Sequence, residues 1–205
     1  MAVDRQGGDH SAPHGSKIAL LIIDMISDFE FESGHLLFRH AMPAARKILR
    51  LKQRARAARI PTIYVNDNFG QWRSDFRQLV HRCVNEPLRG APIARMLVPD
   101  DEDYFVLKPA NSGFFSTPLR TLLQLIGVET IVLTGVTSDR CVLFTAADAY
   151  VRNFELVVPR DCVAASNQKD NELALQYFKR VLKADVRNSS LIALPHATRR
   201  KRAGS

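Results

Sequence analysis

Three side chains suited to acyl-transfer chemistry follow apolar runs of the kind that form buried strands. Asp24 comes directly after KIALLII (17–23), Lys108 closes YFVLK (104–108), and Cys141 lies just past ETIVLTG (129–135). The strands of a parallel sheet bring their carboxyl ends to one edge, where ligands bind. These three groups could therefore converge in a doubly wound fold.

The three residue types suit a thiol nucleophile assisted by a carboxylate. A helix N-terminus and a nearby ammonium group lower a thiol pKa from about 8.5, so we expect a lowered pKa for Cys141, with Lys108 as the cation. Asp24 could take the thiol proton and pass it to a leaving amine. If the loop GVTSDR wraps around the crevice, amides near Thr137 and Cys141 form an oxyanion hole. This combination predicts acyl transfer from an amide to water.

Each residue also has a structural explanation when it is taken alone. Asp24 could be a polar strand end, Lys108 a surface lysine, and Cys141 a small apolar packer on a helix, which is a common role of free cysteine. Their shared position at the ends of strands favours the catalytic interpretation.

Alternating strand and helix patterns predict the fold class. Further strand-like runs occur at 60–66 and 154–159, and a final apolar run occurs at 190–194. Helical spacing occurs at 41–59, 117–126, 139–152 and 168–183, with a shorter helical segment at 76–84. Pro43 fits the first turn of the 41–59 helix, and Gly127 fits the end of the 117–126 helix. We predict an α/β fold with a doubly wound, mainly parallel six-stranded sheet and helices on both faces, in three α/β/α layers.

Length and composition indicate one globular domain. The chain has 205 residues, of which 46% are hydrophobic and 24% charged. We predict a disordered leader at 1–16, a single domain at 17–195, and a basic tail at 196–205. No apolar run approaches the roughly 20 residues of a membrane helix, and the first 16 residues lack the apolar core of a signal peptide. A cytoplasmic protein without membrane contact is the resulting expectation.

The three cysteines predict free thiols. Cys83, Cys141 and Cys162 are odd in number, widely spaced and without a CxxC pattern, which argues against a disulfide framework or a zinc knuckle. Cys83 and Cys162 are interpreted as structural, because neither begins a helix at a strand end.

Positive charge is concentrated in two segments. The net charge of +8 comes largely from the 41–59 helix and from a run of basic residues at 199–202. No aromatic residues interleave with these charges, so a solvated helix face and tail are favoured over a nucleic-acid site. A binding protein that uses these segments to contact nucleic acid or an acidic partner remains the alternative of a different class.

Three segments resemble the isochorismatase-like cysteine hydrolases, which include nicotinamidases, N-carbamoylsarcosine amidohydrolases and ureidoacrylate amidohydrolases. They are ALLIIDMISDF, LKPANSGFFSTPL and TIVLTGVTSDRCVLFTAADAYVRNFELVVPRDCVAAS, and the resemblance covers roughly residues 17–194. It implies an Asp24-Lys108-Cys141 triad with Cys141 as nucleophile, and a non-proline cis peptide at Val136–Thr137 that turns the amides of Thr137 and Cys141 toward the oxyanion. It also implies a homo-oligomer, and structural roles for Asp148 and Asp161.

Departures from the subfamilies narrow the activity that the resemblance implies. Nicotinamidases carry histidines for a metal site after the second strand, but this region reads NDNFGQWRSDF, with Asp67 and no histidine. The six histidines of the chain are scattered, so we predict neither a metal site nor any other cofactor. Isochorismatases proper cleave a vinyl ether and typically lack the cysteine. Cys141 therefore favours hydrolysis of a C–N bond, with a vinyl-ether hydrolase as the alternative.

Substrate recognition is assigned to loops that should surround the crevice. The candidate residues are Phe29, Asn66, Trp72, Arg73 and Phe115. An aromatic wall with one cation suits a small planar amide or a carboxylate-bearing amide. The alternative is that Trp72 and Phe115 pack in a subunit interface.

Overall fold

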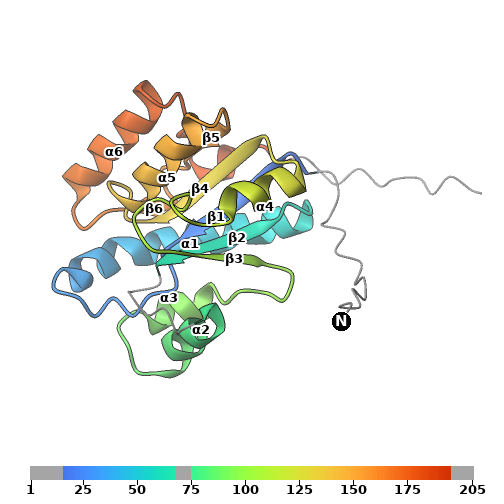
Figure 1. Ribbon diagram of the computed structural model, residues 1–205. Coiled ribbons are helices and arrows are strands. Elements are labelled where there is room, and N and C mark those ends of the chain that lie inside the picture. The colour runs from blue at the N-terminus through green and yellow to red at the C-terminus, as the bar shows by residue number, and fades with distance from the viewer. Residues whose placement is uncertain (1–15, 68–74, 195–205) are drawn as a thin grey trace, which may run out of the picture.

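The apolar run after Lys17 forms β1 (Ile18–Ile23), an interior strand of a parallel sheet (Figure 1). The computed structural model describes residues 16–67 and 75–194, and within these ranges six strands make one sheet. The others are β2 (Thr62–Asp67), β3 (Tyr104–Lys108), β4 (Thr130–Val136), β5 (Glu155–Val157) and β6 (Val163–Ala164). Their order is β3-β2-β1-β4-β5, β6 also pairs with β4, and all these pairings are parallel. The predicted fold class is confirmed.

Both faces of β1 are buried, which explains its uninterrupted apolar sequence. Side chains alternate across a strand, so Leu21 and Ile23 enter one core while Leu20 and Ile22 enter the other. An unbroken apolar run is therefore what a central parallel strand requires.

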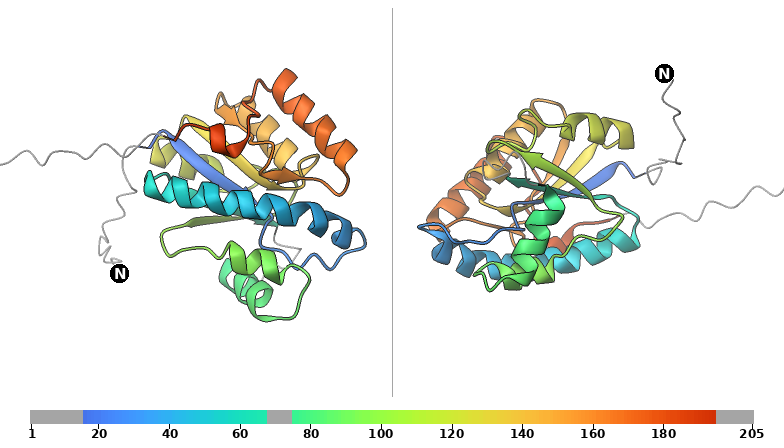
Figure 2. Two further views of the ribbon diagram at one scale, coloured as in Figure 1. Left: turned by 180° about the vertical axis from the view of Figure 1, so that it is seen from behind. Right: turned by 60° about the horizontal axis from the view of Figure 1, so that its bottom comes forward.

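Helices cover the two faces of the sheet unequally (Figures 1 and 2). The first core lies under α4 (Leu119–Ile126), α5 (Cys141–Tyr150) and α6 (Gln168–Arg180). The second lies under the long α1 (Gly34–Ala57) and the short α3 (Ala91–Met96). The remaining helix, α2 (Phe76–Asn85), packs with α3 and beside β3. The structure therefore has three layers, namely helices, sheet and helices. The polar loops that connect them lie at the two ends of the strands.

The first helix begins earlier than predicted. It starts at Gly34 instead of residue 41, so Pro43 lies inside it and not in its first turn. Pro43 is exposed, so the carbonyl that loses its helical donor can be hydrated. Leu37 continues the buried stripe of Ile48 and Leu51 toward the N-terminus, and burial of that stripe outweighs the cost of the proline.

The sixth strand is β6, and the apolar run at 190–194 is not a strand. Residues Ser189–Leu191 form a 3₁₀ helix, η1. The guanidinium of Arg54 donates hydrogen bonds to the carbonyl oxygens of Ser189 and Ile192, at 2.7 and 2.6 Å. This segment is therefore held against α1 by side-chain contacts instead of by a strand ladder.

The predictions of a disordered leader and of a basic tail fall almost entirely outside the described residues. In the part of the chain that the structure describes, none of the helices is both long and apolar enough to cross a bilayer.

Gly135 allows β4 to approach β1 closely, and its replacement is expected to be costly. Its φ is +112°, and an added Cβ would lie 2.0 Å from the carbonyl oxygen of Ile23. Gly127, which ends α4 with φ +81°, has open space around the same position. Gly127→Ala should therefore cost only the strain of a left-handed residue, about 1–2 kcal/mol, whereas Gly135→Ala should lower the free energy of unfolding by clearly more. Urea denaturation of the two variants measures the difference. Equal losses would contradict the close approach.

Candidate active site

The side chains of Asp24, Lys108 and Cys141 meet at the carboxyl edge of the sheet. Asp24 follows β1, Lys108 ends β3, and Cys141 is the first residue of α5, after β4. The Lys108 Nζ lies 2.9 Å from an Asp24 carboxylate oxygen and 3.5 Å from the Cys141 Sγ. The Lys108 side chain has no exposed surface, which excludes the alternative of a surface lysine.

The Asp24 carboxylate is held from two sides. One oxygen, Oδ1, accepts a hydrogen bond from the backbone N–H of Asp67 at 2.7 Å, and the other faces the ammonium of Lys108. Asp24 itself has φ +52°, and its own N–H donates to the carbonyl of Val65 in β2. Lys108 also lies 3.7 Å from a carboxylate oxygen of Asp67. The carboxylate thus has a fixed orientation next to the thiol.

The Cys141 thiol holds its proton more tightly than the sequence analysis predicts, and burial is the main cause. Burial, followed by the negative charge of Asp24, raises the pKa of the Cys141 thiol to about 12, and the ammonium of Lys108 opposes this only in part. The predicted lowering of the pKa of Cys141 is therefore wrong. Burial also raises the pKa of Asp24, against the attraction of Lys108. Burial by itself would lower the pKa of Lys108, but the attraction of Asp24 and Cys141 outweighs it and raises that pKa. Cys141 rests as a thiol beside a carboxylate that is able to accept its proton.

The loop between β4 and α5 contains the cis peptide that the resemblance implied. The bond Val136–Thr137 is cis. The carbonyl of Thr137 accepts from the N–H groups of Arg140 and Val142, and the N–H of Ser138 donates to Ala164 in β6. Within residues 16–67 and 75–194, the backbone N–H groups of Thr137 and Cys141 have no recorded acceptor. One of these two amide donors lies in the loop before α5, and the other belongs to the first residue of that helix.

The loop after β3 is hydrogen-bonded to α5, the helix that begins with Cys141. The hydroxyl of Ser112 donates to the carboxylate of Asp148 in α5, and the N–H of Gly113 donates to the Thr145 hydroxyl at 2.9 Å. That hydroxyl donates in turn to the carbonyl of Cys141 at 2.7 Å. Asp148 therefore joins the loop to the helix, consistent with the structural role that was expected of it.

Asp161 has a comparable function on the other side of the sheet. Its carboxylate accepts hydrogen bonds from the N–H and the hydroxyl of Ser189, at 2.7 and 2.9 Å. It anchors the segment around η1. The two remaining thiols are buried, and burial raises the pKa of Cys83 to about 11 and that of Cys162 to about 12.

The residues predicted to surround the crevice are placed in different environments. Phe29 has no exposed surface and packs edge-on against Phe38, so its side chain lies in the core instead of on the rim. Asn66 is also fully buried and donates from Nδ2 to the carbonyl of Ile26 at 2.7 Å. Phe115 is 58% exposed. Trp72 and Arg73 lie outside the described residues.

One neighbour of the Cys141 thiol was missed at the sequence level. The Oδ1 of Asn111 lies 3.8 Å from the Cys141 Sγ, within the range of a hydrogen bond to sulfur. Its signal in the sequence was its place three residues after Lys108, in a loop that had to pass the thiol.

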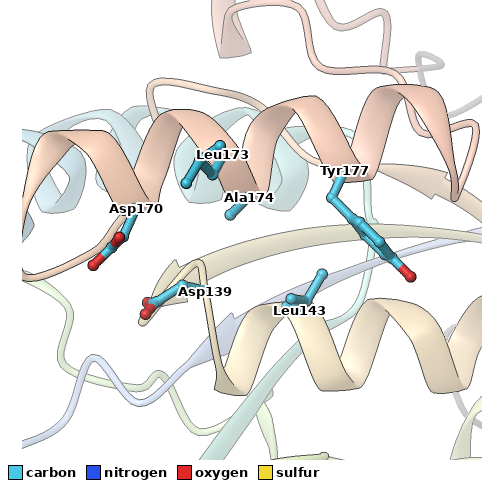
Figure 3. A pocket seen from close by; sticks show the side chains of 6 residues that line it. All are labelled: Asp139, Leu143, Asp170, Leu173, Ala174 and Tyr177. Atoms are coloured by element: carbon cyan, nitrogen blue, oxygen red, sulfur yellow. The ribbon is translucent and has the colours of Figure 1, made fainter.

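A hollow lies away from these groups. It has a volume of about 370 Å³ between α5 and α6, with Asp139 and Asp170 toward one end and Tyr177 at the other (Figure 3). Asp24, Lys108 and Cys141 do not line it, so a ligand bound there would not contact the thiol. In the described ranges, no three histidine, cysteine or acidic side chains are arranged to hold a metal ion.

Fold and site together define a three-layer α/β protein with a thiol, a carboxylate and a buried ammonium at the carboxyl edge of its sheet. The family model described as Isochorismatase domain matches residues 18–187, and the chain belongs to this family of hydrolases. An uncharacterized isochorismatase family protein of Bacillus subtilis (strain 168) is 42% identical over 168 residues, covering 82% of this chain and 92% of that protein.

Relatives with named activities include amidohydrolases. The maleamate amidohydrolase of Pseudomonas putida is 26% identical over 169 residues, which are 78% of each chain. The crystal structure of N-carbamoylsarcosine amidase from Thermoplasma acidophilum superimposes with a TM-score of 0.67 at 31% identity, covering 86% of this chain and 99% of that one. The resemblance found in the sequence is confirmed at the level of the family.

Proposed function

We propose that this hydrolase cleaves a C–N bond in a small amide or carbamoyl compound through a thioester on Cys141. The observation that carries the proposal is the contact geometry, in which buried Lys108 lies 3.5 Å from the thiol and 2.9 Å from Asp24. The names of the relatives that act on maleamate and N-carbamoylsarcosine support the same bond type.

The acylation step uses each group of the site. Asp24 takes the proton of the Cys141 thiol as Sγ bonds to the carbonyl carbon, and the carbonyl π electrons move to the oxygen. The backbone amides of Thr137 and Cys141 donate to this oxyanion. The C–N bond then breaks, and Asp24 returns the proton to the leaving nitrogen, which departs as ammonia or an amine. Lys108 stabilises the negative charge that passes between Asp24 and Cys141.

Deacylation repeats the proton transfers with water. Water attacks the thioester carbon and gives one proton to Asp24, and that proton returns to the Cys141 sulfur as the S–C bond breaks. The acid is released and the resting thiol is restored. No step needs a metal or an organic cofactor.

Recognition of the substrate is assigned to the loops at the carboxyl edge of the sheet. Phe115, Trp72 and Arg73 contact the substrate directly in this proposal. Asn66 acts through the loop after Asp24, because its amide holds the carbonyl of Ile26. Phe29 shapes the same loop from the core side.

The assembly and compartment complete the proposal. We propose that the protein is a homo-oligomer. Analytical sedimentation measures its mass in solution and so tests this. Its cysteines are unpaired within the described residues. Free thiols are typical of reducing compartments, so we propose that the protein acts in the cytoplasm.

The basic residues of α1 give little support to the alternative of a protein that binds nucleic acid or an acidic partner. Lys52 is buried and pairs with Asp103 at 2.7 Å, Arg56 pairs with Asp100 at 3.2 Å, and Arg54 holds the segment around η1. These cations have structural partners. Their charge is therefore only partly available to an acidic ligand.

The direct test is a panel of small primary amides and carbamoyl compounds incubated with the reduced protein. We expect release of ammonia or an amine from at least one of them, and an acyl adduct on the Cys141 peptide in acid-quenched samples. Cys141→Ala should abolish both signals. Amide hydrolysis that survives this substitution would overturn the thioester. Cleavage of a vinyl ether that persists in Cys141→Ala would favour the vinyl-ether alternative, in which Cys141 is incidental.

A further inference from the structure

The two sides of the Cys141 thiol have different neighbours. Lys108, which is fully buried, approaches Sγ at 3.5 Å from the interior. Asn111, which is exposed, approaches it at 3.8 Å. An electrophile must reach Sγ from the solvent side, because the interior side is occupied. It therefore arrives next to the amide of Asn111.

The position of Asn111 is fixed by the residues that follow it. Ser112 is bonded to Asp148, and Gly113 is bonded to Thr145, both in the helix that begins with Cys141. On its other side, Lys108 is the last residue of β3 and makes its own contacts with the site. The loop therefore holds Asn111 at a set distance from the nucleophile, which is the requirement for a group that orients a substrate.

The carboxamide of Asn111 has unused hydrogen-bonding capacity. In the part of the chain that the structure describes, its one recorded hydrogen bond is the contact of Oδ1 with the Cys141 thiol. When the thiol proton passes to Asp24, Oδ1 loses this donor and faces a negatively charged sulfur. An N–H group on the attacked carbonyl compound is suited to replace it, because a carbonyl oxygen accepts from N–H and an ester offers none.

We propose that Asn111 is a substrate-orienting residue that accepts a hydrogen bond from the N–H of the scissile amide and so selects amides over esters. This inference rests on the proposed function, since it names what the same site recognises. It assigns the preference for amides over esters to a side chain that contacts the Cys141 thiol.

A pair of alkylating reagents tests the proposal without any turnover. Chloroacetamide and methyl chloroacetate both alkylate a thiol at CH₂, but only the first carries N–H groups. In Asn111→Ala we expect the rate constant at Cys141, measured by peptide mass spectrometry, to fall about tenfold with chloroacetamide. With methyl chloroacetate we expect it to stay within about twofold of the wild-type value. An equal fall with both reagents would show that Asn111 acts only on the thiol, and no change with either would show that it has no role; both results overturn the proposal.

The matched control is Asn85→Ala. Asn85 is an exposed asparagine that ends α2 and bonds to the carbonyl of His81. The same chemical change there should leave both rate constants at the wild-type value. A comparable fall in this variant would assign the Asn111 effect to general destabilisation, which also overturns the proposal.

The rate of substrate hydrolysis gives a second test of the role of Asn111 that is independent of alkylation. For an amide that the wild type hydrolyses, Asn111→Ala should lower kcat/KM about tenfold, and for the corresponding methyl ester by less than about twofold. If the wild type hydrolyses no amide but Asn111 still determines the preference for chloroacetamide, the proposed function fails while the recognition of an N–H group by Asn111 stands. If amides are hydrolysed and Asn111→Ala changes nothing, only the assignment fails.

Discussion

Replacing Asp24 with asparagine is expected to abolish hydrolysis and at the same time to make Cys141 more reactive toward iodoacetamide. In the proposed mechanism Asp24→Asn removes the base that takes the thiol proton, so the hydrolytic rate should fall about 10²–10⁴-fold. The negative charge of Asp24 also contributes to the raised pKa of Cys141. Without that charge the ammonium of Lys108 acts on the thiol unopposed by Asp24, and the pKa of Cys141 falls.

The two effects are separated by measuring them on the same preparation. Removing a neighbouring like charge shifts a pKa by about one unit or more, so alkylation at neutral pH should become about tenfold faster while hydrolysis disappears. The comparison must be made at a pH above the raised pKa of Asp24, because Asp24 carries its negative charge only above that pKa. Alkylation that slows in parallel with hydrolysis would contradict the resting state described here, since it would mean that the wild-type thiolate depends on Asp24.

A distant carboxylate next to a buried lysine provides the control for Asp24→Asn. Asp103 lies 2.7 Å from the Nζ of Lys52, whose side chain is only 7% exposed. Asp103→Asn makes the same chemical change in a similar environment away from the thiol. It should leave both hydrolysis and alkylation of Cys141 unchanged.

Much of the fold could be predicted because its central strands are buried on both faces. β1 is an unbroken apolar run, and β4 is a mostly apolar run that contains Thr134 and Gly135. Both are followed by polar residues, so the sequence indicates two buried strands of a parallel sheet. β6 has two residues, Val163 and Ala164, and no periodicity can be read from so short a strand. The start of α1 was missed because Pro43 indicates a first turn, and its exposure, which makes an interior position tolerable, is a tertiary property.

The position of the site could also be predicted, but its electrostatics could not. Parallel strands bring Asp24, Lys108 and Cys141 to one edge of the sheet, however far apart these residues lie in the sequence. The direction of the pKa shift of Cys141 depends on how burial and Asp24 compare with Lys108, and those quantities exist only in the folded chain. Phe29 shows the same limit, because a left-handed φ of +56° and full burial turn a loop residue into a core residue.

Replacing Lys108 with methionine is expected to have the largest effect on stability. Methionine retains much of the volume of lysine but leaves the buried carboxylate of Asp24 without its ammonium partner. Breaking a buried ion pair from one side typically costs about 3–5 kcal/mol. We therefore expect Lys108→Met to lower the free energy of unfolding by about 3 kcal/mol or more at pH 8, measured by urea denaturation, and to slow alkylation of Cys141, because Lys108 is the group that lowers the pKa of this thiol.

The sign of the pH dependence identifies the charge responsible. Without Lys108 the pKa of Asp24 in the folded protein rises further above its unfolded value of about 3.9, because the attraction that opposed the effect of burial is gone. A group with a raised folded pKa contributes stability at low pH that is lost as the pH rises through that pKa. The deficit of Lys108→Met should therefore be smaller at pH 5 than at pH 8. A deficit that is equal at both pH values would mean that the loss comes from packing and not from the uncompensated carboxylate.

Lys52→Met separates the stability effect from the effect on the thiol. Lys52 is buried between Asp100 and Asp103, at 3.1 and 2.7 Å, so its loss leaves the carboxylate of Asp103 without its ammonium partner. It has no contact with Cys141, and this variant should be destabilised while its Cys141 is alkylated at the wild-type rate. If both lysine variants slow alkylation to the same extent, the change in Lys108→Met reflects loosening of the fold. If only Lys108→Met slows it, the ammonium acts on the thiol directly, as the 3.5 Å contact requires.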